Sequence, residues 1–71
     1  MMLLGQLTQQ TTIAGNVKLT HWDNGIVVNC KEIIGTENLL EESGLGLWNW
    51  MPIDRIYAAQ DGFLHIDFES K

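Results

Sequence analysis

The sequence has little cysteine, little positive charge and no long apolar run. Cys30 is the single cysteine among 71 residues, so a disulfide framework is excluded and a zinc knuckle lacks ligands. No apolar stretch approaches the roughly 20 residues of a membrane-spanning helix. The first residues, 1–6, carry no basic side chain, and their apolar stretch is too short for a secretory signal. We therefore expect a cytoplasmic protein.

The shortage of positive charge limits the possible partners. Four Lys and Arg stand against nine Asp and Glu, which leaves a net charge of −5. The four cations are scattered along the chain, at Lys18, Lys31, Arg55 and Lys71. Proteins that bind a nucleic-acid backbone or an anionic membrane present clustered Lys and Arg. We therefore expect a protein partner of basic character, and neither nucleic acid nor a membrane.

The length allows one domain, residues 1–71, with a thin core. A hydrophobic content of 45% is ordinary for a globular protein and too high for a disordered tail. A chain of this size buries only about 60% of its unfolded surface. We expect self-association into a homo-oligomer, because it would compensate for the thin core.

A β-hairpin is predicted for residues 17–31. Two β-rich runs flank Asn24-Gly25, a dipeptide typical of the type I′ turn, in which both central positions need a positive φ. In the second run Cys30 alternates with Ile26 and Val28. We therefore interpret Cys30 as a small buried hydrophobe and not as a nucleophile.

A second hairpin is predicted near the C-terminal end. Residues 53–58 lead into a turn at residues 60–62. In residues 63–68, apolar side chains then alternate with a second set that contains both polar and apolar side chains. This alternation places three apolar side chains on one face, those of Leu64, Ile66 and Phe68.

The other segments predict further strands. Residues 36–44 suit a loop with at most one helical turn, with a short strand through residues 38–42 as the alternative. Residues 45–53 are predicted to form a strand, with Pro52 at an edge or a bend. Residues 1–12 are ambiguous between helix and strand, because Leu3, Leu4 and Leu7 are spaced for a helical turn. The β-branched residues Thr8, Thr11, Thr12 and Ile13 favour a strand, and we count a first strand near residues 6–13.

Five strands with tight turns predict an all-β fold with at most one short helical turn. The first choice is a small five-stranded SH3-like or Sm-like barrel, and an OB-like barrel is the alternative. The strand pattern resembles that of Sm-like barrels at four segments, which are Val17-x-Leu19, Gly25-x-Val27-Val28, Asn38-Leu39-Leu40 and Pro52-Ile53-x-x-Ile56. This resemblance implies a ring that binds RNA, but the chain lacks the basic and polar loop residues for such binding.

Two His-x-Asp pairs, His21-x-Asp23 and His65-x-Asp67, are candidate metal ligands. Residues i and i+2 of a strand share a face, so neighbouring strands would bring four ligands together. We favour the alternative, in which Asp23 bonds to the backbone of its turn and the second pair lies on a solvated face. Gly44-Leu45-Gly46 lacks the lysine of a phosphate-binding loop. We therefore predict no metal, no cofactor and no catalytic residue.

The three tryptophans are the most informative residues. With a period of two, Trp48 and Trp50 share one face of the predicted strand, opposite its aliphatic side chains, and Trp22 also leaves the aliphatic face of its own strand. If the aliphatic faces form the core, all three indoles lie at the surface, where Trp is a leading hot-spot residue. In the alternative, Trp48 and Trp50 belong to the core.

Glu37, Glu41 and Glu42 form the local acidic cluster, either as a solvated loop or as a group that steers a basic partner. We predict a non-enzymatic acidic binding module that acts by protein–protein contact through these glutamates and the tryptophans. Small phage-encoded inhibitors that occlude a larger target offer an analogy of size and charge. The alternatives are a ring-forming nucleic-acid binder of the Sm-like kind and a small-molecule site at a subunit interface.

Overall fold

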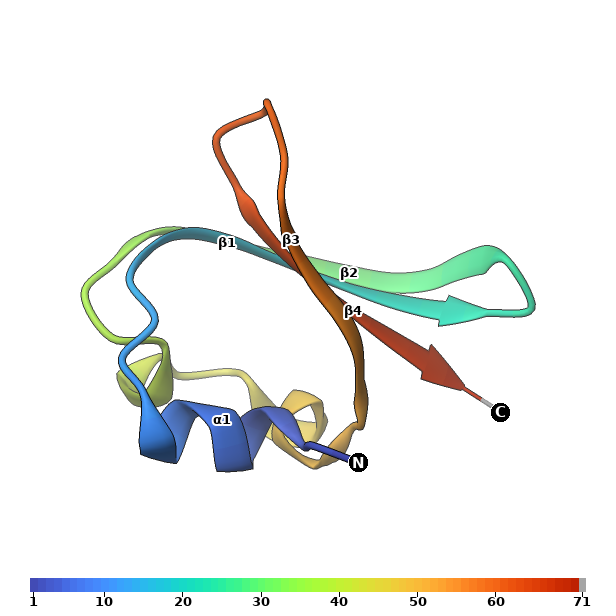
Figure 1. The fold of residues 1–71 in the computed structure, drawn as a ribbon, viewed down its shortest axis with the longest axis horizontal. Coiled ribbons are helices and arrows are strands. Elements are labelled where there is room, and N and C mark those ends of the chain that lie inside the picture. Colours follow the sequence, from blue (N-terminus) through green and yellow to red (C-terminus); the bar gives the residue numbers. More distant parts are fainter. Residues whose placement is uncertain (71) are drawn as a thin grey trace.

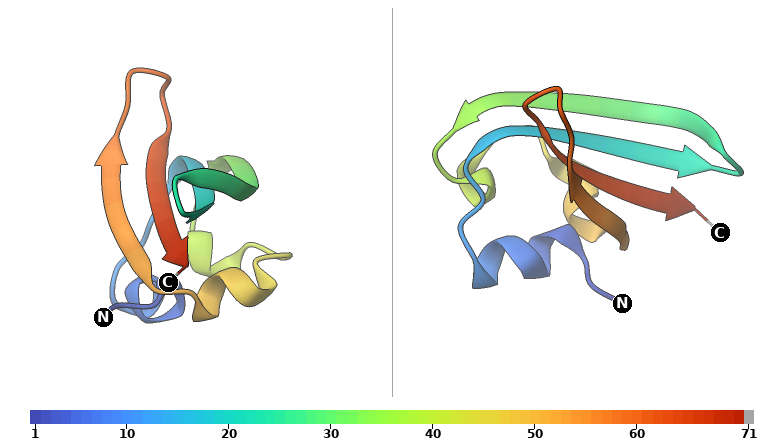
Figure 2. Two further views of the ribbon diagram at one scale, coloured as in Figure 1. Left: turned by 90° about the vertical axis from the view of Figure 1, so that its right-hand side faces the viewer. Right: turned by 45° about the horizontal axis from the view of Figure 1, so that its top comes forward.

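A computed structural model describes residues 1–70 and places a sheet over a layer of short helices (Figures 1 and 2). The elements in chain order are α1 (Leu4–Gln10), β1 (Gly15–Asp23), β2 (Ile26–Thr36), the 3-10 helices η1 (Leu39–Glu41) and η2 (Gly46–Trp50), β3 (Ile53–Ala58) and β4 (Leu64–Ser70). The helical elements lie on one face of the sheet, which we call the covered face (Figure 2). The opposite face, which bears Trp22, Arg55, Tyr57, His65 and Asp67, is called the open face.

The sheet has the order β2-β1-β4-β3. Each outer pair is an antiparallel hairpin, and the two central strands, β1 and β4, are parallel. The predicted mostly-β domain is therefore confirmed. The predicted five-stranded closed barrel is wrong, because the part of the chain that is described forms four strands in an open sheet. β2 and β3 are its two edges.

Both hairpins are confirmed. Asn24 and Gly25 adopt φ values of 53° and 79°, as the type I′ turn requires. In β4, Ile66 and Phe68 are fully buried against the helical layer, and Leu64 packs against the same core. These elements follow from local signals that the sequence carries by itself.

The first predicted strand is wrong, because residues 4–10 form α1. Leu4, Leu7 and Thr8 are spaced three and four apart, so they face the core from one side of the helix. The side chain of Gln6 accepts a hydrogen bond of 2.9 Å from the backbone N–H of Leu3 and so caps the first turn. The β-branched residues that favoured a strand come mostly after the helix ends.

The strand predicted for residues 45–53 is also wrong, because this segment contains η2. Side chains three apart eclipse in a 3-10 helix, and Leu45 and Trp48 accordingly point together into the core. Trp48 is 8% exposed, and its ring lies 5.2 Å from that of Phe68, whereas Trp50 is 74% exposed. The alternative with a tryptophan in the core is therefore right for Trp48 and wrong for Trp50.

The segment between the hairpins forms the expected loop with one short helical turn. This turn is η1, which buries Leu39 completely. Asn38 caps η1, because its side-chain oxygen accepts a hydrogen bond of 3.2 Å from the backbone N–H of Leu40. Within residues 1–70 no helix is long and apolar enough to cross a membrane.

The burial predicted for Cys30 is wrong. Cys30 is exposed on the edge strand β2. Ile26, Val28 and Ile34 are exposed on the same strand, since the helical layer does not extend beneath most of it (Figure 1). The alternation of Ile26, Val28 and Cys30 therefore does not place these side chains in the core, because β2 is largely open to solvent.

Candidate functional site

A β-bulge at Asp54 decides how β3 presents its side chains. Ile53 pairs with Phe68 and Arg55 pairs with Asp67, so Asp54 is an extra residue with no counterpart on β4. Ile53 consequently packs against the core, while Arg55 reaches the open face and bonds to Asp67. In a regular strand, Ile53 and Arg55 would lie on the same face of the sheet, because they are two positions apart. The bulge places them on opposite faces.

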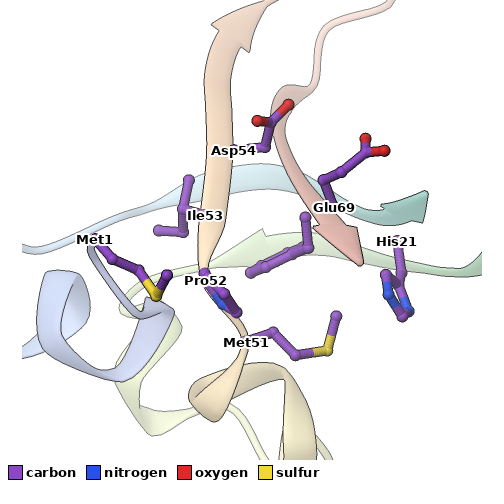
Figure 3. Close-up of a pocket in the computed structure, with 8 residues that line it drawn as sticks. Met1, His21, Met51, Pro52, Ile53, Asp54 and Glu69 are labelled. Carbon is purple, nitrogen blue, oxygen red and sulfur yellow. The ribbon is translucent and has the colours of Figure 1, made fainter. Parts of the chain in front are cut away.

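A cavity opens beside this bulge on the covered side of the sheet (Figure 3). Its volume is about 560 Å³. We call it the cleft, and its apolar lining consists of Met1, Met51, Pro52, Ile53 and Phe68. Backbone contacts hold the N-terminal segment at this place, because the N–H of Ile53 donates a hydrogen bond of 2.8 Å to the carbonyl of Met2.

Three polar residues, His21, Asp54 and Glu69, complete the lining of the cleft. His21 comes from the covered face of β1 and pairs in register with Phe68. The carboxylates of Asp54 and Glu69 lie together at one edge of the opening (Figure 3). An apolar interior with a few polar groups at its border is the usual form of a ligand-binding site.

Met1 and Met51 both line the cleft with their thioether side chains (Figure 3). Methionine side chains are unbranched and polarizable, so they can adjust to apolar surfaces of different shape. These two residues therefore give the cleft an adaptable wall.

The open face carries a chain of polar and aromatic contacts. Arg55 Nε donates a hydrogen bond of 2.7 Å to Oδ2 of Asp67, and the Arg55 guanidinium lies 4.7 Å from the centre of the Tyr57 ring. Tyr57 stacks on His65 at a centroid distance of 4.9 Å, and His65 Nε2 lies 2.8 Å from Oδ2 of Asp61. Both members of the pair His65 and Asp67 are buried, so the prediction that they lie on a solvated face is wrong.

Two ionisable groups of the open face titrate away from their ordinary values. The hydrogen bond from Arg55 to Asp67 and the charge of that carboxylate raise the pKa of Arg55. The backbone N–H of Phe63, which donates a hydrogen bond of 3.0 Å, and the side chain of His65 lower the pKa of Asp61. Both shifts stabilise the charged form.

The structure separates the residues that were predicted to form one interface. Trp22 is half-buried on the open face, Trp48 belongs to the core, and Trp50 lies on the helical layer beside Leu40. The three indoles therefore do not share a surface.

The predicted acidic cluster lies around η1. Glu37 and Glu41 are exposed, while Glu42 is half-buried and accepts a hydrogen bond of 2.6 Å from the hydroxyl of Thr36. None of these glutamates lines the cleft.

The two His-x-Asp pairs do not converge. His21 lies on the covered face and His65 on the open face, so the sheet itself separates them. Among residues 1–70 no group of three or more His, Cys, Asp or Glu side chains is placed to hold a metal ion.

Sequence reasoning missed Asp54 and Glu69 as site residues, and it did not single out Met51 or Ile53 as residues that line a cleft. The hydrophobic period identified Phe68 correctly as an inward side chain. It carried no signal for the bulge, because an extra residue in β3 becomes visible only once the register with β4 is known.

Comparison of the chain with protein-family models, with curated proteins and with solved structures finds no match.

Proposed function

We propose that this protein is a non-enzymatic binding module that acts by protein–protein contact, and that the cleft receives an apolar side chain from a basic segment of its partner. The observation that carries this proposal is the combination in one cavity of an apolar, methionine-bearing lining and two carboxylates at the edge.

The size and lining of the cleft support binding of an apolar group. Its volume of about 560 Å³ falls within the range of about 300–1,000 Å³ that is typical of ligand sites. Hydrocarbon and thioether groups gain free energy by excluding water from an apolar surface. The apolar part of the lining therefore supports binding of an apolar side chain.

Charge complementarity supports a basic partner. Asp54 and Glu69 border the cleft, and the whole chain carries a net charge of −5. Such a field accelerates encounter with a basic surface and disfavours an acidic one. We therefore propose that a small acidic protein of this kind acts as an inhibitor or adaptor that occludes a basic surface of its target. The exposed Trp50, Glu37 and Glu41 are candidates for a wider contact surface on the helical layer.

The test is a titration with three blocked tripeptides, Ac-Lys-Phe-Lys-NH₂, Ac-Glu-Phe-Glu-NH₂ and Ac-Lys-Ser-Lys-NH₂. Methyl signals of the methionines report on the site, because Met1 and Met51 line the cleft and Met2 does not. We expect the first peptide to shift the Met51 methyl signal in a saturable way, and the other two to bind at least several-fold more weakly.

Two variants with the same change of charge control this experiment. Met51→Glu places a carboxylate in the apolar lining and is expected to abolish the shift of the Met1 methyl signal. Leu47→Glu places the same group on an exposed position of η2 and is expected to leave binding intact. Equal binding of the lysine and glutamate peptides, or no saturable shift with any of the three, would contradict the proposal.

A further inference from the structure

A second pocket lies on the helical layer, between residues of α1, η1 and η2. Its volume is about 270 Å³. Three carboxamide and three apolar side chains line it, those of Gln6, Gln9, Asn49, Leu3, Leu40 and Trp50. We call it the amide pocket, and none of the described residues lines both this pocket and the cleft.

The packing of α1 against η2 forms the amide pocket. These two elements lie side by side in the helical layer (Figures 1 and 2). Gly5, which also lines the pocket, permits their close approach, because a Cβ at this position would lie only 3.1 Å from the carbonyl oxygen of Asn49. The backbone N–H of Leu3 donates a hydrogen bond of 2.9 Å to Oε1 of Gln6, which orients this carboxamide and leaves its NH₂ group as a donor. Carboxamides from two elements therefore meet at one pocket.

The lining of the amide pocket is uncharged. None of the described residues that line it bears an ionisable side chain, and the glutamates of the helical layer, Glu37, Glu41 and Glu42, lie outside it. An ionic ligand would lose hydration there without gaining a partner of opposite charge. The net charge of −5 further disfavours an anion such as a phosphate. The lining therefore favours a neutral, polar ligand.

Trp50 gives the amide pocket an aromatic surface that a ligand can cover. Its side chain is 74% exposed, although an indole is among the largest apolar groups in proteins. The face of an aromatic ring carries a partial negative charge, so it packs favourably against C–H groups, which are slightly positive. A ligand with a flat face of C–H groups therefore suits Trp50.

The carboxamides suit a ligand that bears several hydroxyl groups. A carboxamide both donates and accepts hydrogen bonds, and so does a hydroxyl group. A hexopyranose combines hydroxyl groups around its rim with C–H groups on the faces of its ring. The volume of about 270 Å³ lies just below the range of about 300–1,000 Å³ that is typical of sites for drug-sized ligands, and it suits a single ring.

We infer that the amide pocket binds an uncharged hexopyranose, with one face of the sugar ring on Trp50 and ring hydroxyl groups bonded to the carboxamides of Gln9 and Asn49. A proline-rich peptide fits less well, because it docks in grooves lined by several aromatic rings, whereas Trp50 is the one aromatic residue among the described residues of the lining. The inference concerns a different surface from the cleft and does not rest on the function proposed for the cleft.

The test is ligand-observed NMR, in which magnetisation saturated on the protein is transferred to a bound sugar. The probe is methyl β-D-glucopyranoside, because all of its ring substituents are equatorial and both faces of its ring present C–H groups. We expect saturable transfer that is strongest at the C–H groups of one face. Methyl β-D-glucuronide, which adds a negative charge at nearly the same shape, should bind several-fold more weakly. Tetrahydropyran-2-methanol, which lacks the ring hydroxyl groups, should show no saturable transfer.

D-Glucose distinguishes the two sources of such a ring. A sugar within a glycan lacks the free hydroxyl group at its linked carbon, as the methyl glycoside does. Tighter binding of D-glucose than of the glycoside therefore indicates the free sugar, and equal or weaker binding indicates a glycan. Both results support the inference.

Two matched pairs of variants test the residues of the amide pocket. Gln9→Ala removes a carboxamide of the lining and is expected to weaken binding several-fold, whereas Gln10→Ala removes the next carboxamide of α1, which lies outside the lining, and should leave binding unchanged. Trp50→Ala is expected to abolish saturable transfer. Leu47→Ala truncates another exposed apolar side chain of η2 outside the pocket and should leave binding unchanged.

Several results would overturn the inference. They are no saturable transfer to the glycoside in the wild-type protein, equal transfer to tetrahydropyran-2-methanol, and equal weakening by the two members of either pair. Tighter binding of Ac-Pro-Pro-NH₂ than of the glycoside would also overturn it and would assign the amide pocket to a proline-rich peptide.

Discussion

Arg55 Nε donates a hydrogen bond of 2.7 Å to Oδ2 of Asp67, a carboxylate that is only 2% exposed on the face of the sheet that no helix covers. The two residues are direct neighbours across β3 and β4, and the bulge at Asp54 creates this register. The Arg55 side chain itself is 61% exposed, so the cation keeps its contact with water while the anion does not. Asp67 therefore depends on Arg55 for the only hydrogen bond that its side chain is seen to make among the described residues.

The dependence of Asp67 on Arg55 predicts a loss of stability in Arg55→Ala. The substitution leaves a buried carboxylate without a partner, which is costly because neither water nor a donor compensates the charge. We expect a clear fall in the urea midpoint. Lys18→Ala is the control, since it breaks the more exposed pair of Lys18 and Glu32, and we expect it to change the free energy of unfolding by no more than about 0.5 kcal/mol. Equal midpoints for the two variants would show that Asp67 does not need Arg55.

The different positions of the two neighbouring tryptophans predict opposite results for their substitution. Trp48→Ala removes a buried ring that contacts Phe68, and we expect it to lower the free energy of unfolding by about 3–5 kcal/mol. Trp50→Ala truncates an exposed ring, and we expect a change within about 0.5 kcal/mol. Urea unfolding followed by circular dichroism checks both values. A stable Trp48→Ala protein would contradict the placement of η2 against the core.

The turn between β1 and β2 predicts a backbone effect at Gly25. Its φ is 79° and a Cβ at this position would meet no atom within 4 Å, so Gly25→Ala is penalised by backbone strain alone. We expect a loss of about 1 kcal/mol in the free energy of unfolding. Gly25→Asn should cost less, because asparagine tolerates a positive φ better than alanine does. The same loss in both variants would argue against the left-handed turn.

The lowered pKa of Asp61 predicts a pH dependence of stability. A carboxyl group whose pKa is lower in the folded state stabilises the fold above its unfolded pKa, and this contribution is lost as the pH falls through the folded value. We expect the difference in urea midpoint between the wild type and Asp61→Asn to be full at neutral pH and to shrink below a pH of about 4. Glu41→Gln removes an equal charge on the helical layer and controls for net charge. A difference that stays constant down to pH 2 would contradict the assignment.

The exposed edge strand β2 is the surface through which we expect the protein to form a homo-oligomer. Ile26, Val28 and Ile34 are exposed on this 11-residue edge strand, and an unprotected edge of this kind pairs readily with another strand. We predict self-association through β2, measured by sedimentation equilibrium. Val28→Lys should lower the average mass toward that of a monomer, whereas Leu47→Lys on η2 should not. A monomeric wild-type protein would contradict the prediction of self-association through β2.

The hairpins could be predicted from the sequence because their signals are local. Asn24-Gly25 determines a turn through its own backbone preferences, and the alternation up to Phe68 determines which side of β4 faces the core. The acidic character likewise follows from composition, since the scattered cations and the net charge of −5 do not depend on the fold.

The tertiary structure alone decided the two segments that were predicted as extra strands. Leu45 and Trp48 are three residues apart, a spacing that buries both side chains only if the segment is helical. The apolar residues of a short segment can fit both the two-residue spacing of a strand and the three- to four-residue spacing of a helix. The packing of η2 and α1 under the sheet selected the helical conformation.

The candidate sites also depend on long-range pairing. The bulge at Asp54 arises from the register between β3 and β4, and Asp54 lines the cleft beside it. Asp67 becomes buried because Arg55 and Trp22 come beside it from other strands. By itself the sequence determined the hairpins, the inward face of β4 and the acidic character of the protein. Which polar and apolar side chains meet was decided only when strands far apart in the chain paired, because local preferences do not specify a register between distant segments.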